Sequence, residues 1–206
     1  MLTSLRVTGF LNKTASNSPA PGGGSVSALA ASLGAALTSM VCRLTIGKKK
    51  YADVQPEMEI VLKQSEELRA QCTAIIDEDT AAFNNVMAAF ALPRDTEEQK
   101  TIRTTAIQEA TKAATVVPLK LMELCSKAIK LVSVITEKGN QNSVSDAGVA
   151  AWMFRAGSEG AALNVKINLA GLHDAAFKEH IQQHMQQYLQ HTQTEADAIL
   201  KHIGAL

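Results

Sequence analysis

Apolar residues in this chain recur every three or four positions, which is the period of an α-helix and not of a β-strand. The one ambiguous segment is 164–172 (NVKINLAGL), where Val165, Ile167 and Leu169 alternate with polar residues, but a single strand there would have no partner. The length of 206 residues corresponds to one domain. We therefore expect an all-α fold: a single-domain helical bundle of five to six helices over residues 1–206.

Proline and glycine residues divide the chain into these helices. We expect helices from Ser25 to about Ile46, from Pro56 to Leu92, from Asp95 or Thr96 to Lys138, from Ser143 toward Ala162, and from about Asp174 to His202. Ser25 is the expected N-cap of the first, and Gly47 should end it. Pro118 lies inside the third helix and should kink or split it, because proline has no N–H to donate.

The charge and cysteine content excludes several classes of protein. The chain has 20 Lys and Arg and 20 Asp and Glu, so it lacks the excess of basic residues that is typical of a nucleic-acid-binding protein. A chain without net charge can also form a homo-oligomer, because no net repulsion opposes association. Three scattered cysteines form neither a disulfide framework nor a zinc site, which favours the cytoplasm. The N-terminus is too polar for a secretory signal. The uncharged stretch between Lys13 and Arg43 is rich in Ala, Ser and Gly, so we expect no membrane span.

A glycine-rich loop, PAPGGGS, leads directly into the first long helix. Gly22, Gly23 and Gly24 carry no Cβ, and the free N–H groups of a helix N-terminus favour an anion or a polar ligand edge. The loop lacks the Gly-Lys-Ser/Thr of a phosphate-binding P-loop. The alternative is a flexible entry loop in which Ser25 is an ordinary N-cap.

An acid interrupts the apolar stripe of the second expected helix. The stripe consists of Met58, Leu62, Cys72, Ile75, Ile76, Phe83, Val86 and Phe90. Asp79 lies three residues after Ile76 and four before Phe83, whereas Asp77 and Glu78 project elsewhere. Burial raises the pKa of a carboxyl group, so Asp79 is a candidate general acid or base. The alternative is an acid paired with Lys or Arg for structure alone.

Two further polar groups allow both a binding and a structural interpretation. Lys48 and Lys49 open a run of lysines at a helix C-terminus, where a solvated basic end is the ordinary interpretation and contact with a ligand carboxylate is the alternative. Asp146 is a candidate binding residue, but the spacing Ser143-x-x-Asp146 also matches a capping box.

Asparagines and histidines complete the candidates. Asn164 and Asn168 would share a helix face and offer amide groups to a heterocycle, or they form helix-end hydrogen bonds. His180, His184 and His191 share a face, but no acidic or cysteine ligand accompanies them, so we expect no metal.

Several of these segments together resemble a known family. The chain contains, in order, SPAPGGGSVSALAASLGAALTSMV, LTIGKKKY, DEDTAAFNNVMAAFALP, EATKAATVVPL, GNQNSVSD and NVKINLAGLHD. These segments resemble the cyclodeaminase/cyclohydrolase family, which comprises the C-terminal domain of formiminotransferase-cyclodeaminase and the stand-alone methenyltetrahydrofolate cyclohydrolases. The resemblance covers the chain from about Phe10 to the final helix.

The resemblance implies a helical homodimer that acts on a one-carbon form of tetrahydrofolate, with no cofactor besides this substrate. It implies that Asp79 is catalytic. The implied binding residues are Gly22, Gly23, Gly24, Ser25, Lys48, Lys49, Asn164 and Asn168, and Asp146 of the GNQNSVSD segment is a further candidate.

We expect hydrolysis of 5,10-methenyltetrahydrofolate to 10-formyltetrahydrofolate, because these residues include no formiminotransferase domain to supply a formimino substrate. The alternatives are a formimidoyltetrahydrofolate cyclodeaminase that releases ammonia, and a non-catalytic folate-binding or scaffold dimer.

Overall fold

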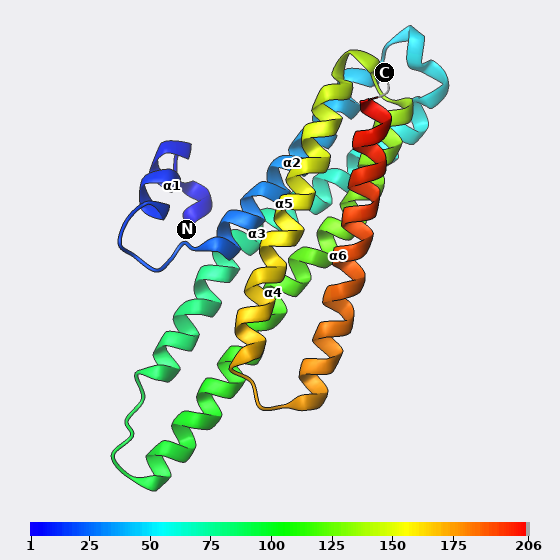
Figure 1. The fold of residues 1–206 in the computed structure, drawn as a ribbon. Coiled ribbons are helices and arrows are strands. Elements are labelled where there is room, and N and C mark those ends of the chain that lie inside the picture. The colour runs from blue at the N-terminus through cyan, green and yellow to red at the C-terminus, as the bar shows by residue number, and fades with distance from the viewer. Residues whose placement is uncertain (205–206) are drawn as a thin grey trace.

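The computed structural model describes residues 1–204 and shows an all-helical bundle (Figure 1). It contains six α-helices, which are α1 (Val7–Thr14), α2 (Gly23–Thr45), α3 (Gln55–Phe90), α4 (Glu97–Lys138), α5 (Val144–Ala170) and α6 (Ala175–Ile203). Short 3₁₀ turns lie at Leu2–Ser4 (η1), Lys49–Val54 (η2) and Gln141–Ser143 (η3). No strand occurs within these 204 residues, so the all-α prediction is confirmed.

Helix α2 lies inside the bundle between α3 and α5, and its small side chains allow close packing. Ala28, Ala31 and Ala35 are fully buried. A Cβ added to Gly157 of α5 would lie 3.0 Å from the Ser27 carbonyl, so the two backbones are nearly in contact there. Helix α2 is long and apolar enough to cross a membrane, but most of its apolar stretch is buried against the other helices.

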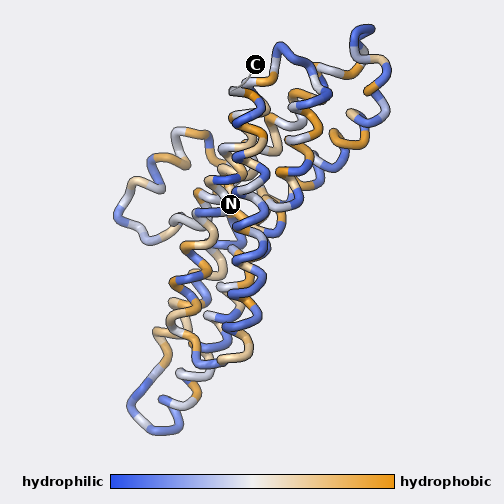
Figure 2. Tube along the Cα trace, turned by 45° about the vertical axis from the view of Figure 1, so that its right-hand side comes forward, coloured by the Kyte–Doolittle hydropathy of each residue, from blue (hydrophilic) through white to orange (hydrophobic). Residues whose placement is uncertain are grey.

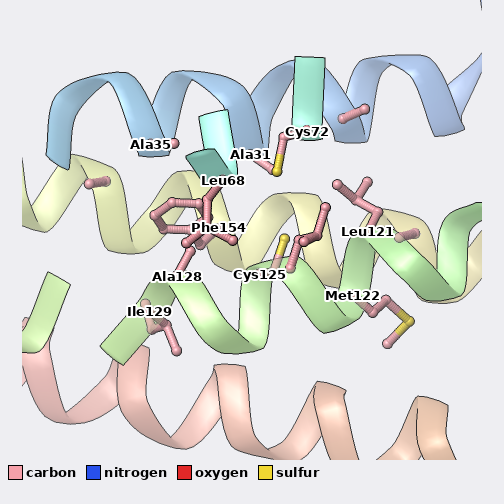
Figure 3. Close-up of a cluster of buried hydrophobic side chains, with 14 of the residues drawn as sticks. Ala31, Ala35, Leu68, Cys72, Leu121, Met122, Cys125, Ala128, Ile129 and Phe154 are labelled. Atoms are coloured by element: carbon pink, nitrogen blue, oxygen red, sulfur yellow. The ribbon is translucent and has the colours of Figure 1, made fainter. Parts of the chain in front are cut away.

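The core is aliphatic with a single large aromatic at its centre. Figure 3 shows Phe154 of α5 between the alanines of α2 and the side chains of Leu68 and Ala128. Cys72 of α3 and Cys125 of α4 lie in the same cluster and are free and buried. The buried polar side chains of these helices are serines and threonines, such as Ser39 and Ser65, whose hydroxyls are 2.6 Å apart.

Two helices extend beyond the rest. The C-terminal part of α3 and the N-terminal part of α4 form an arm that projects past the N-terminus of α2 and the C-terminus of α5 (Figure 1). The connection at its tip is hydrophilic, as Figure 2 shows, and Thr96 caps α4 there in a capping box with Gln99. At the base of the arm, α3 lies beside the start of α2, where the Thr80 and Ser25 hydroxyls are 3.2 Å apart.

Several expected boundaries are confirmed and others are wrong. Gly47 has φ +78° and follows the end of α2, and Pro56 lies in the first turn of α3, as expected. The predicted N-cap at Ser25 is wrong: α2 begins at Gly23 with Gly22 as N-cap, because the Ser25 side chain is used for contacts with α3. Helix α5 continues through 164–170 as helix, well past the expected end at Ala162.

Pro118 does not split α4, which is one helix from Glu97 to Lys138. Proline removes the N–H that would bond to the carbonyl four residues earlier, at Ala114. The Asn168 side chain of α5 supplies that hydrogen, with Nδ2 3.1 Å from the Ala114 oxygen. A donor from a neighbouring helix therefore satisfies the carbonyl, and the helix continues.

Candidate active site

Three consecutive acids on α3 point in three directions. Asp77 accepts hydrogen bonds from the Leu2 N–H and the Thr3 hydroxyl and so holds the N-terminal segment. Glu78 forms an ion pair with Lys120 of α4 at 3.1 Å. Asp79 lies on the interior side of α3, as its position on the apolar stripe predicted. Asp77 and Glu78 are therefore held in structural contacts on the outer side of α3, and Asp79 is the acid of the three that lines the pocket beside the glycine loop.

Asp79 lies against the N-terminus of α2. The Ser25 hydroxyl, fully buried, is 2.9 Å from Asp79 Oδ2 and 2.9 Å from the Ile76 carbonyl oxygen, and it also contacts the Thr80 hydroxyl at 3.2 Å. The first N–H groups of α2 have no partner within their own helix, so this end of the helix favours a negative charge. Ser25 thus holds the carboxylate and does not itself line the cavity.

Opposing effects determine the pKa of Asp79. Burial raises this pKa above its ordinary value, while the hydroxyl and the backbone N–H of Ser25 act in the lowering direction. The net shift is upward. A carboxyl group with a raised pKa is suited to exchange a proton with a substrate near neutral pH.

Gly24 is required for this arrangement. A Cβ built on Gly24 would overlap all three atoms of the Asp79 carboxylate group. Gly23 differs, since a Cβ there would only touch the Asn164 amide at 3.5 Å, an ordinary contact. The glycine loop therefore serves to bring backbone up to an acid, in addition to any contact with a ligand.

A pocket of about 390 Å³ opens in front of Asp79, which is the size range of small-molecule sites. Its wall comes from the glycine loop, α3, α4 and α5. The lining residues are Pro19, Ala20, Gly22, Gly23, Gly24, Asp79, Ala82, Phe83, Val86, Met87, Phe90, Ala114, Asn164, Ile167 and Asn168. Asp79 is the one ionisable side chain among them, and the rest of the wall is mostly apolar.

The structure brings both predicted asparagines to this pocket, but each has a structural contact as well. Asn164 Nδ2 donates to the Gly160 carbonyl of its own helix at 2.9 Å. Asn168 Nδ2 donates to Ala114, as described above. In each residue the carbonyl oxygen and the second amide hydrogen remain for other partners.

Other predicted binding residues lie far from the pocket in this chain. Lys48 and Lys49 follow the opposite end of α2, which is 23 residues or about 34 Å long. Asp146 begins α5, about 27 Å of helix before Asn164. The predicted capping box is also wrong, because Ser143 precedes α5 without a side-chain cap bond. One chain therefore does not assemble all the predicted site.

The distant motifs nevertheless meet one another. The Tyr51 hydroxyl, two residues after Lys49, accepts a hydrogen bond from the Gln141 N–H at 3.0 Å. Asn140 Nδ2 donates to the Leu44 carbonyl at 3.0 Å. The lysine segment and the GNQNSVSD segment thus form one cluster at the far end of the bundle.

Sequence reasoning missed Thr80, which contacts the Ser25 hydroxyl, and Ala114, whose carbonyl fixes an asparagine. The Ala114 carbonyl could have been found from Pro118, because a proline inside a helix leaves the carbonyl four residues earlier without its hydrogen-bond donor.

The histidines of α6 do not converge on a metal site. The rings of His180 and His184 meet edge to face at 4.5 Å, and His191 Nδ1 lies 3.0 Å from the Ser126 hydroxyl. Within residues 1–204, no group of three or more His, Cys, Asp or Glu side chains is arranged to hold a metal ion.

Comparisons of the sequence and the structure with known proteins find similar proteins that belong to one family. Residues 6–187 match the family model described as formiminotransferase-cyclodeaminase. The chain is 50% identical over 170 residues to a methenyltetrahydrofolate cyclohydrolase of Methylorubrum extorquens, covering 82% of each protein. It is 37% identical over 203 residues to the formimidoyltransferase-cyclodeaminase of Mus musculus, covering 98% of this chain and 37% of that protein, so it spans little more than a third of the mouse protein.

The crystal structure of a formiminotetrahydrofolate cyclodeaminase from Thermotoga maritima has a similar fold. The TM-score is 0.87 at 28% identity, with 98% of this chain and 99% of that chain covered.

Proposed function

The chain belongs to the formiminotransferase-cyclodeaminase family, and on that premise we propose that it hydrolyses 5,10-methenyltetrahydrofolate to 10-formyltetrahydrofolate. One observation carries the proposal: the pocket in front of the glycine loop contains a single ionisable group, the carboxyl of Asp79. The 50% identity with a methenyltetrahydrofolate cyclohydrolase supports this activity over the others.

The charge of the pocket suits this substrate. The methenyl form carries a positive charge shared by N5, the bridging carbon and N10. A carboxylate in a mostly apolar pocket attracts such a cation more strongly than it would in water, because the local dielectric constant is lower. Asp79 is fixed by Ser25 and does not have to reorganise when the cation arrives.

The reaction needs three proton transfers, and Asp79 performs two of them. It takes a proton from the water that adds to the bridging carbon, which gives a neutral carbinolamine. It then returns the proton to N5 as the C–N5 bond breaks, while the carbinolamine hydroxyl releases its own proton to water and becomes the carbonyl of the formyl group on N10. Its raised pKa brings the carboxyl closer to the range in which it both accepts and releases a proton.

The second candidate is formimidoyltetrahydrofolate cyclodeaminase. The observation in its favour is the fold and 28% identity shared with the Thermotoga maritima cyclodeaminase. That reaction closes the ring onto the same carbon and expels ammonia, so an acid in the position of Asp79 serves it equally.

The test is the near-ultraviolet absorbance of 5,10-methenyltetrahydrofolate at a pH where uncatalysed hydrolysis is slow. The proposal expects a loss of absorbance that depends on enzyme. Ammonia release from formiminotetrahydrofolate without that loss would establish the cyclodeaminase instead. If neither reaction is accelerated, the chain is a non-catalytic folate-binding or scaffold protein.

The proposed working form is a homodimer, and its interface is the outer face of α2 and α5. These neighbouring helices each carry an exposed apolar stripe: Val26, Leu33 and Leu44 on α2, and Val149, Trp152, Leu163 and Ile167 on α5. The α5 stripe extends over about 27 Å. Leu33 and Trp152 are each 50% exposed. Exposed apolar side chains spread over this length indicate a protein partner.

A second copy is the partner that this surface fits. The pocket lies at one end of the two stripes, beside Val26 and Ile167, and the lysine cluster lies at the other end, beside Leu44. In a two-fold dimer the same patch contacts itself, so an antiparallel pairing brings opposite ends together. Lys48 and Lys49 of the partner subunit then face the pocket.

Mixing two variants that are each impaired tests the shared site. Asp79→Asn removes the acid, and a Lys48→Ala/Lys49→Ala double variant removes the lysines. In a shared site, co-refolded equal mixtures recover about a quarter of the wild-type activity, because half of the dimers are mixed and each has one intact site. Absence of recovery, together with a monomeric mass in sedimentation, would exclude the dimer.

A further inference from the structure

The pocket extends away from Asp79 along one face of α3. Phe83, Val86 and Phe90 follow Asp79 at helical spacing and line it. Asp79 and Phe90 are separated by about 16 Å of helix axis. The pocket is therefore elongated, with a carboxyl group at its inner end and an aromatic ring that is 48% exposed at its outer end.

A guanidinium group stands at the outer end. Arg103 of α4 donates from Nε and Nη2 to the Phe90 carbonyl, at 3.2 and 3.0 Å. Its guanidinium carbon lies 5.5 Å from the centroid of the Phe90 ring. Both contacts fix the plane of the guanidinium, and three or more of its N–H groups remain for other acceptors. Within residues 1–204, Arg103 forms no ion pair with a carboxylate.

Other cations of α4 near the pocket have partners. Lys100 is paired with Glu97 at 2.7 Å, one turn before Arg103. Lys112 is paired with Asp174 at 3.0 Å. Arg103 is thus a positioned cation in this part of α4 whose charge is still available for an anion.

The proposed substrate has the complementary shape. Beyond N10 it continues as an aromatic ring and ends in a glutamate with two carboxylates. Standard bond lengths place these carboxylates about 10–14 Å from the reacting carbon. If that carbon is at Asp79, the aromatic ring lies along the apolar wall and the carboxylates arrive near Phe90.

We propose that Arg103 binds a carboxylate of the substrate's glutamate tail, an inference that rests on the proposed hydrolysis of methenyltetrahydrofolate. The planar guanidinium offers paired donors that match a carboxylate, which a lysine does not. Arg103 is a binding residue at the far end of the substrate and takes no part in the proton transfers at Asp79.

The test combines two enzymes with two substrates. Wild type and Arg103→Ala are compared on 5,10-methenyltetrahydrofolate and on 5,10-methenyltetrahydropteroate, which lacks the glutamate. With the full substrate, Arg103→Ala raises KM about tenfold at nearly unchanged kcat, as expected when one charge-assisted contact is lost. With the truncated substrate, wild type and variant have the same KM. Arg103→Lys, which keeps the charge, restores part of the affinity.

Arg94→Ala is the matched control, because it removes the same charge from the loop at the tip of the arm without removing a contact to Phe90. Its KM stays at the wild-type value for both substrates. The inference is overturned if Arg103→Ala affects both substrates equally, or if the tail-dependent effect follows Lys48→Ala/Lys49→Ala instead. If wild type hydrolyses neither substrate, the proposed function fails and the inference fails with it.

Discussion

Replacing Gly24 with alanine would place a methyl group inside the space that the Asp79 carboxylate occupies. A Cβ at Gly24 lies closer than 3.0 Å to the carboxylate atoms, and real Cβ atoms essentially never approach so closely. The carboxylate must therefore turn away from Ser25. A displacement of about 1 Å at a catalytic group can cost a hundredfold in rate, so we expect kcat to fall about a hundredfold.

The neighbouring glycine supplies the stability control. Ala in place of Gly stabilises a compatible site by about 0.4–1 kcal/mol. Gly23→Ala should show this gain, since its Cβ makes an ordinary 3.5 Å contact with Asn164. Gly24→Ala has the same gain but carries an overpacking cost of about 1–3 kcal/mol. The two variants should therefore differ by about 2–12 °C in Tm, at about 2–4 °C per kcal/mol for a chain of this size.

A double-variant cycle isolates the cause. In an Asp79→Ala background the carboxylate is gone, so Gly24→Ala should become neutral or stabilising, as Gly23→Ala is in wild type. Thermal unfolding by circular dichroism gives the Tm values, and methenyltetrahydrofolate absorbance gives kcat. The reasoning is refuted if Gly24→Ala has the same cost with and without Asp79, or if the two glycine variants unfold alike in wild type.

Three further changes test single contacts. Ser25→Ala removes a donor that lowers the pKa of Asp79, so the acid limb of the kcat/KM profile should move to higher pH; an unmoved limb would show that the acid being titrated is another group. Glu66→Gln should lower the free energy of unfolding by about 0.5–1 kcal/mol at pH 7, measured by denaturant titration. Arg69 and other donors lower the pKa of Glu66 from 4.5 to about 2, so the stability difference between wild type and variant is present above pH 4.5 and disappears as the pH falls through 2. A cost that does not depend on pH would refute this. Asn168→Ala should cost about 1 kcal/mol, and Pro118→Ala in that background should recover it by restoring an N–H; additive losses would contradict the link.

The sequence was sufficient to predict which face of α3 points to the interior of the bundle and carries the candidate acid. Helical periodicity separates Asp79 from Asp77 and Glu78, and the structure places these three acids in separate environments. Proline and glycine likewise marked the main breaks between helices, because their backbone effects are local and independent of the rest of the fold.

The contacts between helices were beyond the sequence. Periodicity gives the face of a helix but not the helix that it meets, so Ser25 looked like an N-cap when its hydroxyl in fact holds Asp79. Asn168 looked like a ligand contact, and its amide also satisfies a carbonyl on α4. Both assignments depend on which helices pack together.

Lys48, Lys49 and Asp146 show a second limit. The resemblance implied that they bind substrate, yet about 34 Å of α2 separates the lysines from the glycine loop in one chain. A sequence motif carries no information about which subunit it serves. The proposed antiparallel dimer reconciles the motif with the distance.

The central claim is that Asp79 carries the protons of a methenyltetrahydrofolate hydrolysis, and the direct measurement is the rate of Asp79→Asn. Asparagine keeps the size of the side chain but does not exchange protons near neutral pH. Since its neutral amide also avoids the cost of a half-buried charge, the variant should unfold at the same temperature as wild type or higher. The account predicts a fall in kcat of about 10²–10⁴-fold with this fold intact. A folded Asp79→Asn variant that still hydrolyses methenyltetrahydrofolate at the wild-type rate would contradict it.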